Sequence, residues 1–359
     1  MVEWIESLIL GVVQGITEFL PVSSDGHLVV TQQIFAWLTG RPHSGEENLF
    51  FDIMLHVGTL AAILLHYRNS IMAGARGFLL GAKDVPPGFE RASVWRVGLL
   101  AIVATLPLIP LKLFFIDWIK ETFKSSQAAG IGFLITAAVL LLVSLKLRGP
   151  AGKKGPAETT FLDALLIGLA QMFAPLPGVS RSGLTIASAL ALGFSPVWAV
   201  GFSLLIAVPA ISGAALSELK DTLTGPRALA LTPDGIARMV VATILAGIVG
   251  YMAILWLIRV VRGGRLWYFS VYLTILGSVV LVVSSQSGGS LDARPPQALD
   301  RPAGSRAAGL PAGGAGRRAG GALDRAHAAG ARPGGPRAGD RNQGRRKTAS
   351  GLLLGRSLA

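Results

Sequence analysis

The amino-acid sequence predicts an all-α integral membrane protein, an inverted-topology repeat with six full transmembrane helices and two re-entrant helical hairpins. Three observations support this fold class. Hydrophobic residues form 51% of the 359 positions and charged residues only 15%, with a mean hydropathy of +0.56, a balance outside the range of ordinary soluble domains. Several apolar runs are long enough to cross a bilayer, and one apolar segment rich in polar residues occurs twice.

Six uninterrupted apolar runs are predicted to be full spans. Each holds roughly the 20 residues that a helix needs to cross a hydrocarbon core of about 30 Å. The runs lie near residues 50–67, 95–116, 128–147, 197–217, 237–258 and 267–284.

Two further apolar stretches, 4–38 and 161–192, are interrupted by Pro, Gly and Ser, so we interpret each as a hairpin of half-helices. The first residues include Glu3 and Glu6 but no Lys or Arg, and we expect them to be retained rather than cleaved as a signal peptide. The absence of cysteine excludes disulfides, thiolate metal ligands and a cysteine nucleophile.

The interrupted stretches contain an internal repeat. LILGVVQGITEFLPVSSDGHL, at 8–28, aligns without gaps with LLIGLAQMFAPLPGVSRSGLT, at 165–185. Chance matching of apolar residues does not explain the identical polar and glycine positions, so a duplication is the better interpretation. Repeat one would cover about 1–127 and repeat two about 128–284. The matched pairs include Gly11 and Gly168, Gln14 and Gln171, Ser23 and Ser180, and Gly26 and Gly183.

The two copies are predicted to enter the membrane from opposite sides. Three full spans separate them, and an odd number of crossings reverses the direction of entry. Folds of this kind place their site near the bilayer midplane, where broken helices from both halves meet. The N-termini of two half-helices would then present unpaired N–H groups to the same point, which suits an anion.

The loops and the C-terminal segment predict orientation and a tail. Lys and Arg are more frequent in 68–94, 148–160 and 259–266, which indicates a cytoplasmic face and places both termini outside. Residues 285–359 are rich in Ala, Gly, Pro and Arg, and we expect a disordered basic tail. A solvated appendage, an RNA- or headgroup-binding segment and a shifted reading frame all remain open, and no nucleic-acid partner is expected.

Ionisable side chains at membrane depth cost about 3 kcal/mol or more each, so they are functional candidates. Gln14 and Glu18 are four residues apart and share one helical face. His27 follows the predicted turn and suits proton transfer or nucleophilic attack on phosphorus. The competing interpretations are a pair of side chains that reach to the interface and a hydrogen-bonded bystander histidine.

Arg181 occupies the corresponding turn of the second copy. A buried guanidinium needs an anionic partner, and its donors match phosphate oxygens. Ser180, Ser182 and Thr185 supply hydroxyl groups around it. A structural ion pair with Glu18 is the alternative.

The remaining polar residues have structural alternatives. Ser23, Ser24 and Asp25 could cap the half-helix, and capping is the preferred interpretation of Asp25. Asp52 and His56 are also four residues apart. We favour a structural role over a direct site role for this pair.

With these residues assembled, the chain resembles the bacterial undecaprenyl-diphosphate phosphatase family, also called the bacitracin resistance protein family. The resemblance covers residues 1 to about 284 and depends on two motifs, one in each half of the protein. The first is an (E/Q)xxxE pattern followed by Pro-Val-Ser-Ser-x-Gly-His, and the second is PGxSRSxxT. The motif residues are Gln14, Glu18, Pro21, Ser23, Ser24, Gly26 and His27, and Pro177, Gly178, Ser180, Arg181, Ser182 and Thr185.

The resemblance implies a membrane hydrolase that converts undecaprenyl diphosphate to the monophosphate plus inorganic phosphate. Such enzymes recycle the lipid carrier of peptidoglycan synthesis in the bacterial inner membrane and confer resistance to bacitracin. It further implies a divalent cation, Mg²⁺ or Ca²⁺, near Gln14 and Glu18, and a site that opens to the periplasmic side. A homodimer remains open. A polyprenyl-phosphate or anion transporter is the alternative function, because inverted repeats also build carriers.

The expected roles follow the motifs. Arg181, with Ser180, Ser182, Thr185 and Ser23, would hold the phosphate. Glu18, His27 and Ser24 would be catalytic, and the nucleophile would be His27, Ser24 or water.

Two departures from the family pattern stand out. Asp25 replaces the usual Ser or Thr, and the tail has no counterpart.

Overall fold

The computed structural model describes residues 2–40, 45–80, 91–111, 113–114, 125–146, 151–224 and 232–286. Within these ranges the regular structure is helical, apart from one isolated bridge between Lys154 and Phe194, which confirms the predicted all-α class. The described residues belong to the unit Met1–Asp300, and the predicted tail lies outside them from residue 287 onward. The helices are α1 (Val2–Phe19), α2 (Ser24–Thr39), α3 (Gly45–His66), α4 (Arg68–Leu80), α5 (Arg91–Thr105), α7 (Ser126–Lys146), α8 (Phe161–Gln171), α9 (Arg181–Ala191), α10 (Pro196–Thr224), α11 (Pro233–Arg262) and α12 (Trp267–Gln286).

Four of the six predicted spans coincide with segments long and apolar enough to cross a bilayer. The other two predicted spans fall on the shorter apolar helices Phe50–His66 and Trp95–Leu111. The four long segments are Ser126–Lys146, Pro196–Leu216, Pro233–Arg262 and Trp267–Gln286.

Large apolar side chains lie on the outside of these helices. Leu142, Ile244 and Ile275 are more than half exposed, whereas Phe133 and Phe202 are fully buried. A soluble protein rarely exposes extended apolar surface, so this distribution suits lipid contact.

Each of the two interrupted stretches consists of two helices, as predicted. Helix α1 ends at Phe19, two residues before Pro21, because the residue that precedes proline disfavours the α conformation. Helix α8 ends at Gln171, and two prolines follow before α9 begins. A serine caps the next helix in both copies: Ser23 accepts from the Gly26 amide at 3.3 Å, and Ser180 accepts from the Gly183 amide at 3.0 Å.

One predicted loop is wrong in its first half. The sequence predicts a loop over 68–94, but Arg68–Leu80 form α4. This segment is rich in Ala, Leu, Ile and Met and contains no proline, so nothing in it terminates a helix.

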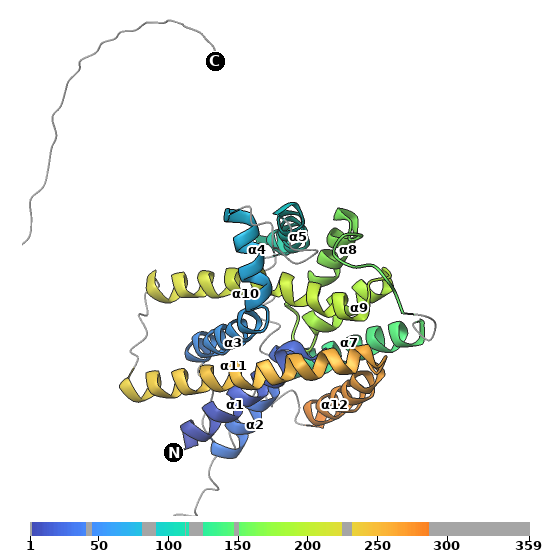
Figure 1. The fold of residues 1–359 in the computed structure, drawn as a ribbon. Coiled ribbons are helices and arrows are strands. Elements are labelled where there is room, and N and C mark those ends of the chain that lie inside the picture. Colours follow the sequence, from blue (N-terminus) through green and yellow to red (C-terminus); the bar gives the residue numbers. More distant parts are fainter. Residues whose placement is uncertain are drawn as a thin grey trace, which may run out of the picture. The chain divides into compact units, whose positions relative to one another are not determined.

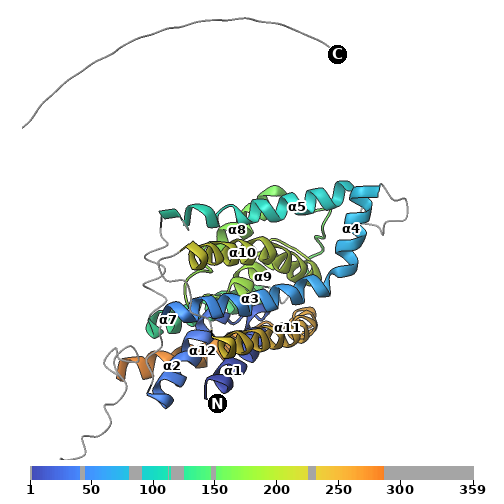
Figure 2. The same ribbon diagram turned by 90° about the vertical axis from the view of Figure 1, so that its left-hand side faces the viewer.

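The contacts between helices are paired across the two copies. Helix α1 packs against α11, and α8, which contains the second copy of the same motif, packs against α5. Helix α3 contacts both α10 and α11 and lies between them in Figures 1 and 2. Helix α7 packs along α12.

Glycines allow these helices to approach closely. A Cβ atom on Gly11 of α1 would lie 2.7 Å from the carbonyl oxygen of Ala242 in α11. A Cβ atom on Gly168, the matching glycine of α8, would collide with the carbonyl oxygen of Ala104 in α5. Small residues at helix interfaces are a common means of association in membranes, because lipid provides no hydrophobic driving force between helices.

We expect Gly11→Ala and Gly168→Ala to destabilise the protein by about 1–3 kcal/mol each, because the added methyl group meets backbone rather than a movable side chain. The thermal unfolding midpoint in detergent measures the effect. Gly98→Ala is the matched control, since a Cβ atom on Gly98 meets nothing within 4 Å. Equal midpoints for Gly11→Ala and Gly98→Ala would contradict the proposed close packing.

Candidate active site

The last two turns of α1 bury a polar pair. Gln14 and Glu18 are 0% and 6% exposed, and the Gln14 side-chain amide donates to Glu18 Oε2 at 2.9 Å. Their spacing of four residues places them on one helical face, as predicted. The carboxylate therefore lies at the end of α1, next to the interruption between α1 and α2.

Glu18 is the centre of a cluster that four helices build. The Ser24 hydroxyl, at the start of α2, donates to Glu18 Oε2 at 2.7 Å. The Arg181 guanidinium, at the start of α9, donates to Glu18 Oε1 at 2.8 Å. His56 Nε2, from α3, lies 3.4 Å from Glu18 Oε2. A buried carboxylate is tolerated only when it is paired and hydrogen-bonded, and these partners meet that requirement.

Arg181 brings the two copies of the motif together. Its side chain is 16% exposed and that of Glu18 is 4% exposed, so the ion pair is shielded but still reachable on the arginine side. The pair with Glu18, which the sequence offered as the alternative role for Arg181, is present. Ser182 follows Arg181 in the chain, and its hydroxyl donates to the Leu20 carbonyl at 2.8 Å. This hydrogen bond is a second link between the two copies of the motif.

His56 lies closer to the cluster than the sequence suggested. Its Nε2 is 3.7 Å from Asp25 Oδ1 as well as 3.4 Å from Glu18, and its Nδ1 is 2.8 Å from the Asp52 carbonyl oxygen. Gln32 joins α2 to α3 through hydrogen bonds from its amide to the Asp52 carboxylate, at 3.0 and 3.2 Å. His56 therefore faces two carboxylates from two other helices.

The two ring nitrogens of His27 contact Ser23 and Tyr272 rather than Glu18. Its Nδ1 lies 2.7 Å from the Ser23 carbonyl oxygen, and its Nε2 lies 2.7 Å from the Tyr272 hydroxyl. A carbonyl can only accept, so Nδ1–H is the donor, and in the neutral ring Nε2 accepts from Tyr272. The imidazole also packs edge-on against Phe133, with ring centroids 5.0 Å apart.

Ser23 holds the turn between α1 and α2 in a strained conformation. Its φ of 69° makes it the one non-glycine residue with positive φ among the residues that the structure describes. Strain of this kind persists only when the surroundings enforce it. Here the hydroxyl caps Gly26 and the carbonyl accepts from His27, so both polar groups of Ser23 have structural partners.

The three hydroxyl groups around Arg181 bond within the protein. Ser180 Oγ accepts from the Gly183 amide at 3.0 Å, Ser182 Oγ donates to Leu20 at 2.8 Å, and Thr185 Oγ1 donates to the Arg181 carbonyl at 2.9 Å. All three residues are buried. In this structure they shape the turn, and their contact with phosphate stays a prediction.

No group of three or more His, Asp or Glu side chains able to hold a metal ion occurs in the part of the chain that the structure describes. The oxygen donors nevertheless suit a hard cation. Gln14 Oε1 is buried without a hydrogen-bond partner beside the Glu18 carboxylate, and Asp25 is a second carboxylate nearby. Mg²⁺ commonly binds one or two carboxylates and completes its shell with substrate phosphate and water.

The sequence did not identify His56, Tyr272 or Phe133 as residues that contact the site. The spacing of Asp52 and His56 was visible, but nothing local shows that α3 packs against the α1–α2 turn. Tyr272 and Phe133, which hold His27, lie in separate apolar spans. Only the tertiary packing identifies these residues.

The chain matches the family described as "Bacitracin resistance protein BacA" over residues 7–279. Curated relatives named undecaprenyl-diphosphatase have similar sequences. That of Carboxydothermus hydrogenoformans is 40% identical over 282 residues, 78% of this chain and 97% of the relative. That of Alkaliphilus metalliredigens is 39% identical over 284 residues, 78% of this chain and 98% of the relative.

A third, from Methanosphaera stadtmanae, is 35% identical over 292 residues, 79% of this chain and 99% of the relative. The matches contain the whole Glu18–Arg181 cluster, and the apolar helices identify a multi-pass membrane protein. The chain therefore belongs to the bacitracin resistance protein BacA family.

Proposed function

We propose that this protein hydrolyses undecaprenyl diphosphate to undecaprenyl phosphate and inorganic phosphate in the bacterial inner membrane, and so recycles the lipid carrier of cell-wall synthesis. The observation that carries the proposal is the Glu18 carboxylate, which binds the Arg181 guanidinium and the Ser24 hydroxyl at once. Relatives that carry the name undecaprenyl-diphosphatase support the choice of substrate.

Arg181 is the anchor for the terminal phosphoryl group. In this structure it is neutralised by Glu18, with Arg181 Nη2 2.8 Å from Glu18 Oε1. A diphosphate brings two or more negative charges, and its oxygens suit the donor fork of a guanidinium. Arg181 would turn at least one donor from Glu18 to the phosphate, where charge spreads over the oxygens during transfer.

Ser24 is the best-placed nucleophile among the candidates. Its hydroxyl already donates to Glu18 Oε2, the arrangement of a nucleophile with its general base. Ser24 Oγ would bond to the terminal phosphorus as the bond to the bridging oxygen breaks and undecaprenyl phosphate leaves. The Ser24 proton passes to Glu18. Water then attacks phosphoserine and releases inorganic phosphate, which restores the Ser24 hydroxyl.

His27 acts on this site indirectly, by holding the turn between α1 and α2. Both of its ring nitrogens are already within hydrogen-bond distance of Ser23 and Tyr272, so an attack on phosphorus would need it to leave both. Its bond to the Ser23 carbonyl holds the strained residue that precedes Ser24. We therefore assign His27 a positioning role.

Gln14, Glu18 and Asp25 are the residues that would hold a divalent cation. The partnerless oxygen of Gln14 is the observation that supports this assignment. When bound, Mg²⁺ or Ca²⁺ would neutralise phosphate charge next to Arg181. It would also offset Asp25, whose carboxylate otherwise repels a diphosphate.

The inverted repeat, with six spans and two re-entrant hairpins, is part of the proposal. It is supported by the serine caps at equivalent positions and by the glycine contacts that the two copies share. A periplasmic opening accords with the basic residues Arg259, Arg262 and Arg265, which mark the opposite face as cytoplasmic.

A transporter would use the same ion pair to bind an anion but would not need a hydroxyl bonded to the carboxylate. The Ser24–Glu18 bond therefore favours the hydrolase. Release of inorganic phosphate from undecaprenyl diphosphate by purified protein in detergent tests the choice. Movement of labelled lipid in vesicles without phosphate release would favour the transporter.

Removal of either partner of the central ion pair should abolish most activity. We expect Arg181→Ala and Glu18→Gln each to lower kcat by about 10²–10³-fold, because the first removes a cation that stabilises developing charge and the second removes the general base. Phosphate release measures the effect. Arg259→Ala, an exposed arginine far along α11, is the control and should retain activity.

Ser24→Ala should lower kcat by at least about 10³-fold, because the nucleophile is lost. His27→Ala should cost only about tenfold, because the turn keeps its serine cap. Rapid acid quench followed by mass spectrometry should detect phosphoserine on the peptide that contains Ser24. Substantial turnover by Ser24→Ala, with His27→Ala inactive, would assign the nucleophile to His27 instead.

A chelator should remove activity, and Mg²⁺ or Ca²⁺ should restore it. In Gln14→Ala, half-maximal restoration should need about tenfold more cation, since one oxygen ligand is missing. Titration of a bound lanthanide by luminescence gives the same comparison without turnover. Full activity after exhaustive chelation would overturn the cation assignment.

A further inference from the structure

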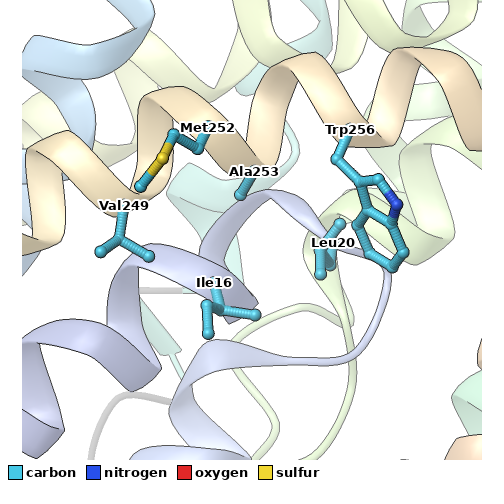
Figure 3. A pocket seen from close by; sticks show the side chains of 6 residues that line it. All are labelled: Ile16, Leu20, Val249, Met252, Ala253 and Trp256. Carbon is cyan, nitrogen blue, oxygen red and sulfur yellow. The ribbon is translucent and has the colours of Figure 1, made fainter.

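An apolar groove of about 300 Å³ runs between α1 and α11. Its lining contains no charged side chain, and the indole of one tryptophan is its only polar group. Figure 3 shows Leu20 beside Trp256 at one end and Val249 with Met252 at the other. The lining residues are Ile16, Leu20, Val249, Met252, Ala253 and Trp256.

We propose that this groove binds the isoprene units nearest the diphosphate of the lipid substrate, an inference that rests on the proposed function. A prenyl chain is pure hydrocarbon, and the groove offers it apolar contact and no hydrogen-bond partner to leave unsatisfied. Residues at helical spacing line each of the two sides of the groove. Ile16 of α1 and Leu20, the first residue after α1, are four residues apart, and the α11 residues follow helical periodicity.

Helices α1 and α11 approach closely next to the groove. A Cβ atom on Gly15 would lie 2.7 Å from Val249 Cβ and 2.8 Å from the Ala246 carbonyl oxygen. Next to this contact, Ile16 and Met252 remain 42% and 55% exposed on the outer surface. The groove can therefore be entered sideways from the hydrocarbon of the membrane.

The position of Leu20 argues for substrate rather than any lipid. Leu20 follows Glu18 by two residues, and its carbonyl accepts the Ser182 hydroxyl at 2.8 Å. Its side chain lines the groove, so one residue belongs to both the turn of the active site and the groove. In the proposed arrangement the phosphate lies at Arg181 and the prenyl chain continues past Leu20 toward Ile16.

The size of the groove limits how much of the chain it holds. A volume of about 300 Å³ is at the lower end of the about 300–1,000 Å³ typical of ligand pockets. It cannot contain the whole polyprenyl chain. The groove therefore holds only a few isoprene units, and the remainder of the chain would lie among membrane lipids.

Filling the groove should impair substrates according to their proximal chain. We expect Ile16→Trp to raise KM for both undecaprenyl and farnesyl diphosphate about tenfold or more, with kcat much less affected. Hydrolysis of isopentenyl diphosphate, which has a single isoprene unit, should change less than threefold. Ile9→Trp is the matched control, since Ile9 is 41% exposed on the same helix and does not line the groove.

A binding measurement separates this inference from the proposed function. A farnesyl monophosphate with a photoreactive group on its second isoprene unit should label Met252 or Trp256, whether or not the protein hydrolyses diphosphates. Unlabelled undecaprenyl phosphate should compete, and Ile16→Trp should reduce the label while Ile9→Trp does not. Label on helices other than α1 and α11, or competition by phosphatidylglycerol alone, would overturn the inference, as would equal KM values for the two tryptophan variants. Failure of wild type to release phosphate would count only against the proposed function.

Discussion

A single buried ion pair, between Glu18 and Arg181, connects the two copies of the repeated motif. Glu18 ends the helix of the first copy and Arg181 begins the helix of the second, 2.8 Å apart and largely shielded from solvent. Breaking such a pair on one side is costly, because an isolated charge remains in a medium of low dielectric. The end of α1 and the start of α9 therefore have to lie side by side. Ser24 and His56 contact the same Glu18 carboxylate.

The broken helices are stabilised by local capping. Ser23 and Ser180 occupy equivalent positions and accept hydrogen bonds from the third residue of the helices that follow. Ser23 also adopts a positive φ, which its hydrogen bonds with Gly26 and His27 help to enforce. The same turn that carries this strain presents the Ser24 hydroxyl to Glu18, so the cost of the conformation coincides with the chemistry of the site.

Much of this arrangement could be predicted from local sequence patterns. The breaks at Pro21 and in the second copy and the shared face of Gln14 and Glu18 could be predicted from spacing and from the repeat. The ion pair of Glu18 with Arg181 was the alternative to a phosphate-binding role for Arg181. His56 could not be placed, because its role depends on how α3 packs on the α1–α2 turn. His27 was expected in the reaction, yet its ring turns to Tyr272, some 245 positions along the chain, and no local pattern encodes that contact.

In the proposed mechanism Arg181 exchanges its partner Glu18 for the phosphate of the substrate. Ligand binding without turnover tests this exchange most directly. The measurement is the affinity of a non-hydrolysable methylene analogue of undecaprenyl diphosphate for wild type, Glu18→Gln and Arg181→Ala in the presence of a chelator. The account predicts that Glu18→Gln binds at least as tightly as wild type, since Arg181 no longer has a competing carboxylate, and that Arg181→Ala loses most of the affinity. Wild-type affinity in Arg181→Ala would contradict it.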